Sequence, residues 1–295
     1  MVSVQDLGYF GPDSVSWQVH REVTVLFGGA RALLLQSAHP LVVAGARQTG
    51  MFQRNPWKRL QRTLLLQYTL TFGTRAQADA AAERINAVHG PVHGIDEVTG
   101  KRYDALDPEL LLWVHAVLVD SALLFERLTI GRLDDVGRQR FHDEQKLAAE
   151  FCRVPRDMIP ATIADLRAYL RDMLVGDQLL VTDDARTVAG LFAHPPAEAE
   201  WKPVLRAVSW WAFGTLPSRL REGYGVRWNR AKQATLRSSL AGVKLGHRAI
   251  PPKYRYIAPY QEWVHRRRGQ PSSGVVEQAR KQVGIRLPSG PDPSR

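Results

Sequence analysis

Two arginines and a threonine are spaced so that they would share one side of a predicted helix. Arg59, Arg62 and Thr63 stand at positions i, i+3 and i+4, which share one face of an α-helix. Guanidinium groups beside a hydroxyl are suited to binding an anionic group. The spacing therefore predicts an anion site early in the helix that follows Asn55.

A histidine ends the next predicted helix. His89 follows Ile85 and Ala82 at helical spacing, on an inward face of mostly small residues that leaves room for a flat, bulky group. A histidine that ligates heme iron must be neutral, and the heme propionates need Arg, Lys or hydroxyl partners. The two helices supply these types, so we predict a heme pocket with His89 as metal ligand and with Arg59 and Thr63 on the cofactor.

Alternative roles for the same residues stay open. Arg59 and Arg62 could instead pair with carboxylates of neighbouring helices, while His89 caps a backbone carbonyl. His115, on the most apolar predicted helix, is the reserve axial ligand. His39, before Pro40, is a further cofactor-binding candidate.

The pair His89 and His93 has the i, i+4 spacing of a two-histidine zinc or non-heme iron site. Gly90 and Pro91 lie between them, so a regular helix through both is not expected. Four more histidines, His142, His194, His247 and His265, lie among polar or basic residues and are predicted to be solvated.

Helical patterns separated by Gly and Pro run along the chain, and almost no alternating strand pattern interrupts them. The expected fold is all-α, with one large helical domain over residues 1–265 and a basic, poorly ordered tail over 266–295. The helix boundaries are best marked at Asn55-Pro56, at Gly73 and at the capping box of Thr74 and Gln77. Helices are predicted from Asp13-Ser14 to Gly28-Gly29, then over residues 30–38, 41–50, 56–72, 75–89, 109–128, 134–153, 161–174, 183–192, 200–213 and 226–241.

The composition is that of a globular protein. The chain has 295 residues, is 44% hydrophobic and has one cysteine, Cys152, which excludes an internal disulfide or a cysteine-built metal centre. The apolar run from Leu110 to Phe125 is interrupted by polar residues, and the first residues lack the pattern of a signal peptide. No membrane span is predicted, and a cytoplasmic location is expected.

The positive charge is concentrated at the C-terminal end. The net charge is +11, and residues 201–295 hold 19 Lys and Arg against 4 Asp and Glu, whereas residues 1–200 hold 21 against 25. A second hypothesis is therefore a non-catalytic helical protein that binds nucleic acid or an anionic membrane through this region. Solubility, or docking onto an acidic partner, would explain the same charge equally well, and nucleic acid is not an expected partner.

Several motifs in chain order resemble one known family. They are His39-Pro40, Arg59-x-x-Arg62-Thr63, Val88-His89-Gly90-Pro91-Val92-His93-Gly94, Gly100-Lys101-Arg102-Tyr103-Asp104-Ala105 and Leu112-Trp113-Val114-His115-Ala116, with Leu216 to Gly225 and Pro251 to Pro259 later. Together they resemble the bacterial branch of the oxygenase family that contains MpaB and the latex clearing protein, a rubber oxygenase. The resemblance extends over roughly residues 15 to 265.

The resemblance implies a globin-like all-α core that holds heme b and uses O2. In the rubber oxygenase, the distal helix has Arg, two residues and then Lys-Thr, and a histidine is the proximal ligand. Arg59 and Thr63 match this pattern, and His89 matches the ligand. Arg62 stands where that protein has lysine, and an arginine stays charged and does not normally ligate iron. No residue here is matched to the catalytic glutamate of that family.

The sequence thus predicts a heme b-dependent oxygenase, with O2 and a small hydrophobic molecule as substrates and with an electron donor as a further partner. Arg59, Arg62 and Thr63 are the predicted catalytic residues. A heme carrier or gas sensor is an alternative, because it needs the same pocket. The substrate and the oligomeric state are not predicted.

Overall fold

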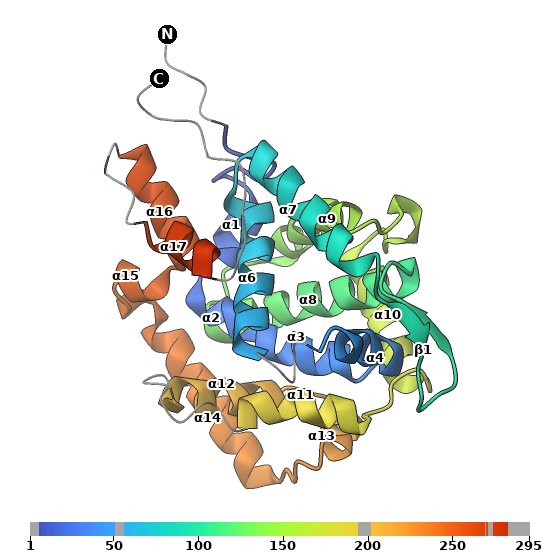
Figure 1. The fold of residues 1–295 in the computed structure, drawn as a ribbon. Coiled ribbons are helices and arrows are strands. Elements are labelled where there is room, and N and C mark those ends of the chain that lie inside the picture. The colour runs from blue at the N-terminus through green and yellow to red at the C-terminus, as the bar shows by residue number, and fades with distance from the viewer. Residues whose placement is uncertain (1–5, 51–55, 194–201, 269, 271–273, 283–295) are drawn as a thin grey trace.

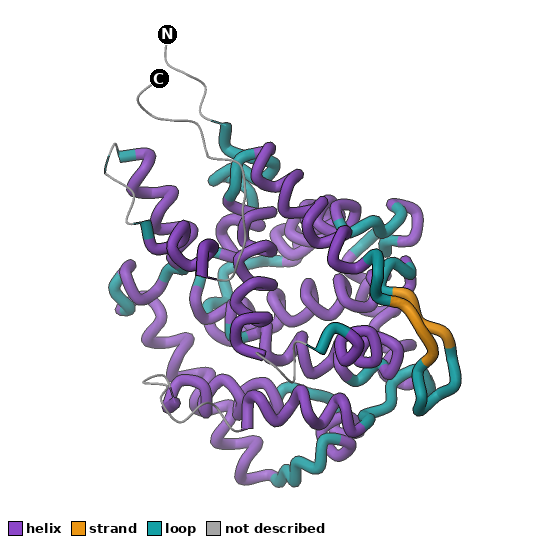
Figure 2. The backbone as a smooth tube through the Cα atoms, in the orientation of Figure 1, coloured by secondary structure: helices purple, strands orange, loops and turns teal. Residues whose placement is uncertain are grey.

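The fold is known from a computed structural model that describes residues 6–50, 56–193, 202–268, 270 and 274–282. Helices make up most of it, and one short hairpin lies at the edge of the molecule in Figure 2. The all-α class predicted from the sequence is confirmed. The globin-like arrangement of its core stays a prediction.

The first half of the chain contains eight helices and both strands of the described part. They are α1 (Val15–His20), α2 (Val23–Leu26), α3 (Gly28–Ser37), α4 (Pro40–Gln48), α6 (Pro56–Phe72), α7 (Arg75–His89), β1 (His93–Ile95), β2 (Arg102–Asp104), α8 (Pro108–Thr129) and α9 (Asp135–Phe151). The later helices are α10 (Ile163–Val175), α11 (Asp183–Ala193), α12 (Lys202–Gly214), α13 (Ser218–Gly223), α14 (Arg230–Gly246), α15 (Pro252–Arg255), α16 (Ala258–Arg267) and α17 (Val275–Gln282).

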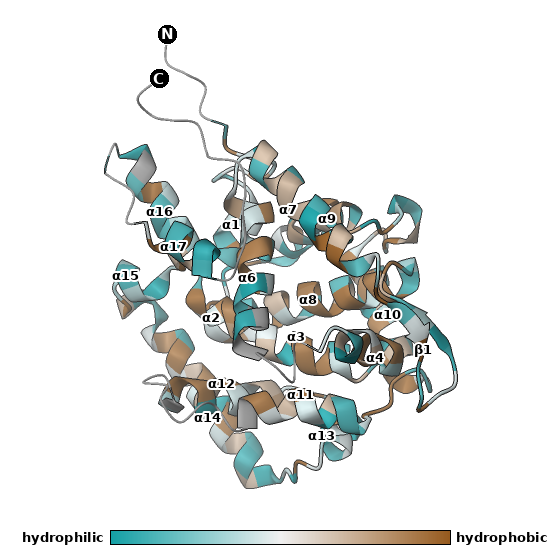
Figure 3. Ribbon diagram, in the orientation of Figure 1, coloured by the Kyte–Doolittle hydropathy of each residue, from teal (hydrophilic) through white to brown (hydrophobic). Residues whose placement is uncertain are grey.

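Helix α8 is the centre of the packing. It contacts α2, α3, α9, α10 and α14, and Figure 3 shows it as a largely hydrophobic ribbon in the middle of the molecule. It begins with Asp107, whose side chain accepts a hydrogen bond from the Glu109 amide, and with Pro108, a residue suited to a first turn. Its length and hydropathy would also allow it to cross a membrane, but 67% of its most apolar window is buried inside the protein, as expected of a core helix.

Polar residues on α8 have partners inside the fold. Arg31 of α3 is buried, and its Nη1 donates to the Asp120 carboxylate and to the Ser121 hydroxyl, both at 2.7 Å. A buried guanidinium without such partners would be strongly destabilising. Asp120 and Ser121, which interrupt the apolar run of α8, therefore join this helix to α3.

The glycine pair near residue 28 has a role besides the predicted one. We predicted that the first helix is interrupted at Gly28-Gly29, and α2 does end at Leu26 while α3 begins at Gly28. A Cβ at Gly28 would lie 2.8 Å from the Ser121 carbonyl oxygen and 3.1 Å from the Phe125 ring. The glycine is therefore needed for the close approach of α3 to α8, which is a contact between residues far apart in the chain.

The predicted first helix is also broken earlier, at Glu22. This residue is extended, with φ −84° and ψ 122°, and forms an isolated β-bridge with Tyr256. Its buried carboxylate accepts hydrogen bonds from Arg255 at 2.8 and 2.9 Å and from Nε2 of His247 at 3.0 Å. The Glu22 cluster, defined as Glu22, His247 and Arg255, thus ties the C-terminal part of the chain to the start of the fold.

Two further segments differ from the sequence-based expectations. The stretch after α7, where no strand pattern was recognised, contains the antiparallel pair of β1 and β2, in which Gly94 faces Tyr103. The segment 266–295, expected as a poorly ordered tail, contains α17. Val276 of α17 is buried, and Arg280 donates a hydrogen bond to Thr69 of α6 at 3.0 Å.

Loss of the Glu22 carboxylate should destabilise the whole protein. We expect Glu22→Ala to lower the free energy of unfolding by about 3–5 kcal/mol, because the partly buried Arg255 would lose its counter-charge. Glu97→Ala is the matched control, since Glu97 is 76% exposed in its pair with Arg47, and it should cost no more than about 1 kcal/mol. Urea denaturation of both variants measures this, and equal losses would contradict a special role for the cluster.

Candidate functional site

The turn between α6 and α7 positions the candidate site. Gly73 donates its amide to the Thr69 carbonyl at 2.9 Å, and a Cβ at this residue would lie only 2.5 Å from the same oxygen. Thr74 then forms the predicted capping box with Gln77, which fixes the start of α7. Both helices begin and end where the sequence predicted.

From this turn the two helices diverge, as Figure 1 shows. Near the turn they are held together by a small apolar cluster in which Leu66 and Leu70 of α6 pack against Ala78, Ala81 and Ala82 of α7. The alanines therefore serve close helix packing at this end of the pair. The room that we expected over the small-residue stripe is filled here by leucine side chains.

His89 lies on the same stripe, further from the turn. It follows Ala82 and Ile85 at helical spacing, and both of these belong to the face that packs toward α6. His89 is the last residue of α7 and is half-buried, with its Nδ1 atom buried. The predicted ligand therefore stands on the inner side of α7 where the helices have separated.

The positive charge of an exposed arginine on α7 acts on a half-buried arginine of α6. Arg62 of α6 is half-buried, and its pKa is lowered first by burial and then by the positive charge of Arg84 on α7. No carboxylate of the described residues forms an ion pair with either side chain. Arginine stays charged at neutral pH, so the pair forms a cationic region that an anion would stabilise.

The remaining two members of the predicted cationic face are less defined. Thr63 is exposed, so the structure does not bring it into the interior with Arg62. Arg59 lies in the first turn of α6, but its side chain is outside the described residues. The alternative that Arg62 pairs with a neighbouring carboxylate finds no support among the described residues.

The alternative of a two-histidine metal site is not favoured. His93 does not continue α7 but lies exposed on β1, opposite Asp104. The turn at Gly90 and Pro91 removes the helical i, i+4 relation to His89. Within the ranges that the structure describes, no three His, Cys, Asp or Glu side chains form a group that could hold a metal ion.

His39 is buried at the junction of α3 and α4. Its backbone is extended, as expected for a residue before proline, and its Nδ1 has no hydrogen-bond partner among the described residues. Burial lowers the pKa of His39 to about 4, although Asp107 opposes the shift. The ring is therefore neutral at pH 7 and keeps one nitrogen able to donate or to accept.

His115 is the corresponding group on α8. It is buried as predicted, and its Nε2 lacks a hydrogen-bond partner in the described part of the protein. Burial, with a smaller effect of nearby His142, lowers the pKa of His115 to about 3. A neutral imidazole with a free ring nitrogen satisfies the chemical requirement of a ligand, so His115 keeps its place as the reserve.

The prediction of solvated histidines was wrong in two cases. His142 is fully buried, with its Nε2 at 2.8 Å from the Pro160 carbonyl, and His247 belongs to the Glu22 cluster. His265 is half-buried, and His194 lies outside the described residues. Polar neighbours in the sequence do not place a residue at the surface, because a helix presents adjacent residues to different sides.

Two residues beside the site were missed. Arg84 stands five residues before His89 and was not distinguished from other surface charges. Asn86 is buried and donates from Nδ2 to the Phe151 carbonyl at 2.8 Å, which holds the end of α7 to the end of α9. An asparagine on the buried side of a helix was the available signal, since buried polar groups are generally hydrogen-bonded.

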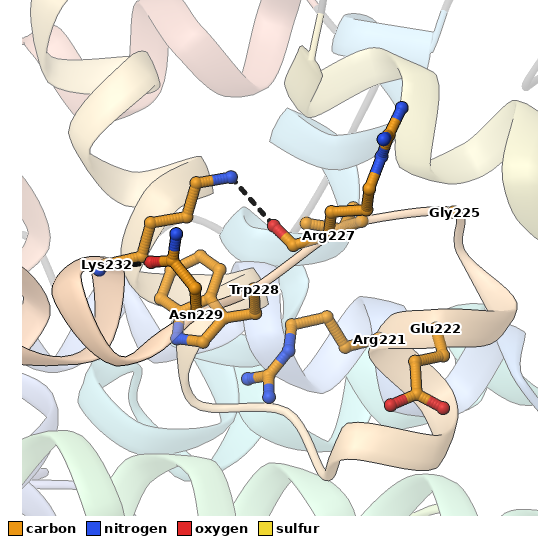
Figure 4. A pocket seen from close by; sticks show the side chains of 8 residues that line it. Arg221, Glu222, Gly225, Arg227, Trp228, Asn229 and Lys232 are labelled. Carbon is orange, nitrogen blue, oxygen red and sulfur yellow. Dashed lines mark hydrogen bonds between the residues drawn. The ribbon is translucent and has the colours of Figure 1, made fainter.

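A separate pocket lies between α13 and the start of α14. It has a volume of about 560 Å³ and is lined by Arg221, Arg227, Trp228 and Lys232, among others. Figure 4 shows Lys232 directed to the Arg227 carbonyl, to which it donates a hydrogen bond at 2.7 Å, and Arg221 beside Trp228. Arg221 and Lys232 already have partners inside the protein, and Figure 4 shows the Arg221 and Arg227 side chains pointing apart.

Buried neutral histidines predict loss of stability in acid. The pKa values of His20 and His39 are lowered to about 4 and that of His115 to about 3, in each case chiefly by burial. Since an unfolded histidine has a pKa of about 6.5, their contribution is present above pH 6.5 and decreases as the pH falls toward 4. Between pH 6 and 4.5 each should add a slope approaching about 1.4 kcal/mol per pH unit.

The test is urea denaturation of a His115→Asn variant over that range. Its unfolding free energy should depend less steeply on pH than that of the unchanged protein, by roughly 1 kcal/mol per pH unit. His93→Asn is the control, because His93 is exposed on β1, and it should keep the original slope. An unaltered slope in His115→Asn would mean that this imidazole does not stay neutral in the fold.

Comparison with known proteins identifies the family of this chain. Residues 17–245 match the family described as the ER-bound oxygenase mpaB/B' and rubber oxygenase catalytic domain. Relatives include the uncharacterized proteins Mb2261 of Mycobacterium bovis and Rv2237 of Mycobacterium tuberculosis, each 25% identical over 246 residues, which is 80% of this chain and 93% of the relative. No solved structure matches significantly. The match includes α6, α7 and α8 and most of the described fold, and the chain therefore belongs to the mpaB and rubber oxygenase catalytic-domain family.

Proposed function

We propose that the protein is a heme b-dependent oxygenase that oxidises or oxidatively cleaves a small hydrophobic molecule. Membership of an oxygenase family supports the reaction class, since O2 and a substrate are the reactants of an oxygenase. One observation carries the cofactor proposal: Arg62 and Arg84, which form no ion pair with a carboxylate among the described residues, occur on the same pair of helices as His89.

The donor set of this chain suits heme. Heme presents two propionate carboxylates, which need cationic partners, and an iron that takes a neutral imidazole. Arg62, with Arg59 and Thr63 on the same helix, would bind the propionates or orient the substrate, and His89 would hold the iron. When bound, the heme would supply the activation of O2, which side chains alone do not provide.

The two buried histidines and α8 would complete the pocket. The neutral rings of His39 and His115 each retain a nitrogen able to bond with the cofactor or with a bound water. The apolar surface of α8 would provide a wall that excludes water and accommodates a hydrophobic substrate. His115 is the reserve ligand, which would hold the iron if His89 does not.

Absorption spectroscopy tests the cofactor and its ligand. The purified protein should show a Soret band, and we expect His89→Ala to lose it because the imidazole that holds the iron is removed. His115→Ala should retain the band, and it is the control for the loss of a buried histidine that does not hold the iron. Retention in His89→Ala with loss in His115→Ala would reverse the ligand assignment, and a protein that never binds heme would refute the proposal.

Arg62 should contribute to heme affinity through its charge. Arg62→Ala removes one charge-assisted contact to a carboxylate, so heme should bind about tenfold or more weakly. Arg167→Ala is a matched control, because Arg167 is an exposed arginine on α10 and should leave heme affinity unchanged. Titration with hemin measures both, and an equal affinity for the two variants would exclude Arg62 from the cofactor site.

A further inference from the structure

One stretch of the chain, residues 223–261, has cations and no carboxylates. Residues 223–261 contain eight Lys and Arg and neither Asp nor Glu. This stretch forms α14, the short 3-10 helix His247–Ala249 and α15, along the left side of the molecule in Figure 1. The positive charge of the C-terminal half is therefore gathered on neighbouring surface elements.

Some of these cations have a structural use and others do not. Arg255 is held by Glu22, and Lys244 donates to the Arg127 carbonyl at the end of α8. In contrast, Arg230, Arg237 and Arg248 are exposed and form no ion pair with any carboxylate in the part that the structure describes. Charges that stabilise nothing within the fold are available to a partner.

Helix α14 orders these charges along one side. Arg230 and Arg237 are seven residues apart, which places them in line on the helix, and Arg248 follows its last turn. On the inner side, Leu236 and Leu240 are buried in the cluster that includes Phe125 of α8. The helix spans about 25 Å, so the charges extend along a long, outward-facing element.

Two large apolar side chains protrude beside the same charges. Leu245, at the end of α14, is 86% exposed, and Tyr254 of α15 is 64% exposed. Leu245 continues a ridge of exposed residues, Ala234, Ser238 and Ala241, at spacings of four, three and four. The outermost line of the helix is thus small or apolar, and the cations border it.

We propose that this surface, the α14 face (Arg230, Arg237, Leu245, Arg248 and Tyr254), docks the protein onto an anionic lipid bilayer. The cations would contact the lipid phosphates, while Leu245 and Tyr254 would enter the boundary between headgroups and acyl chains. A nucleic acid would also attract the cations, but the outward leucine would gain nothing on a phosphate backbone. This role goes beyond the proposed oxygenase chemistry and does not depend on heme.

Vesicle sedimentation of the full chain tests the charge. The protein should bind vesicles of phosphatidylcholine with phosphatidylglycerol, should bind vesicles of phosphatidylcholine alone far less, and should be released by high salt. Reversing three cations in one variant, Arg230→Glu, Arg237→Glu and Arg248→Glu, should weaken binding by at least about 100-fold, since each cation near a charged membrane strengthens binding about fivefold.

A matched variant changes the net charge equally at another place. Arg140→Glu, Arg167→Glu and Arg171→Glu reverse three exposed arginines of α9 and α10, on the other side of the molecule in Figure 1. This variant should lose less than about tenfold in affinity, because screening limits the effect of distant charges. Equal losses in the two triple variants, or no preference for anionic lipid, would overturn the proposal.

Leu245→Ala distinguishes a bilayer from a nucleic acid. Since the side chain is exposed, the variant should keep the melting temperature of the unchanged protein. It should bind anionic vesicles several-fold more weakly and a DNA duplex as the unchanged protein does. Duplex binding that is tighter than vesicle binding, together with vesicle binding that is insensitive to Leu245→Ala, would identify nucleic acid as the partner and refute the lipid surface.

Discussion

Burial of α8 is the constraint on which the other parts of the structure depend. Trp113, Val117 and Phe125 of this helix are almost completely removed from solvent, and each contributes roughly 1.5–3 kcal/mol through burial. A helix that is apolar nearly all round can be stable in water only when other helices surround it. The positions of α2, α3, α9, α10 and α14 follow from this requirement.

The same burial sets the chemistry of the histidines. His115 is carried inside by α8, and His39 by the junction between α3 and α4, where removal from water keeps each ring neutral. Such groups cost stability, because their charged forms are not solvated, and they persist where a partner or a function uses them. The separated ends of α6 and α7 differ in character, since there the positive charges of Arg62 and Arg84 lack a described counter-charge.

The molecule therefore separates two kinds of positive charge. On α6 and α7 the cations occur on the same pair of helices as the half-buried His89, which suits an anionic ligand. Along α14 the cations lie on an outer surface beside exposed Leu245 and Tyr254, which suits a large flat partner. The Glu22 cluster connects these regions, because it fixes the segment after α14 to the break between α1 and α2.

The sequence by itself determined those features that depend on neighbours within a few residues. The capping box of Thr74 and Gln77, the first turn at Pro108 and the apolar pattern of α8 are local signals, so the main helices were predicted to within a few residues. The residue types of the candidate site were also evident, because Arg62 and His89 belong to recognisable helical spacings. The family motifs were likewise contained in the linear order of the chain.

Tertiary structure alone decided which distant residues meet. Gly28 acts through its contact with Ser121 and Phe125, and the break at Glu22 depends on a carboxylate that reaches residues more than 200 positions away. Burial of His142 and the approach of Arg84 to Arg62 likewise arise from the packing of separate helices. No pattern within a single helix specifies these contacts, because their energies arise only when separate elements exclude water between them.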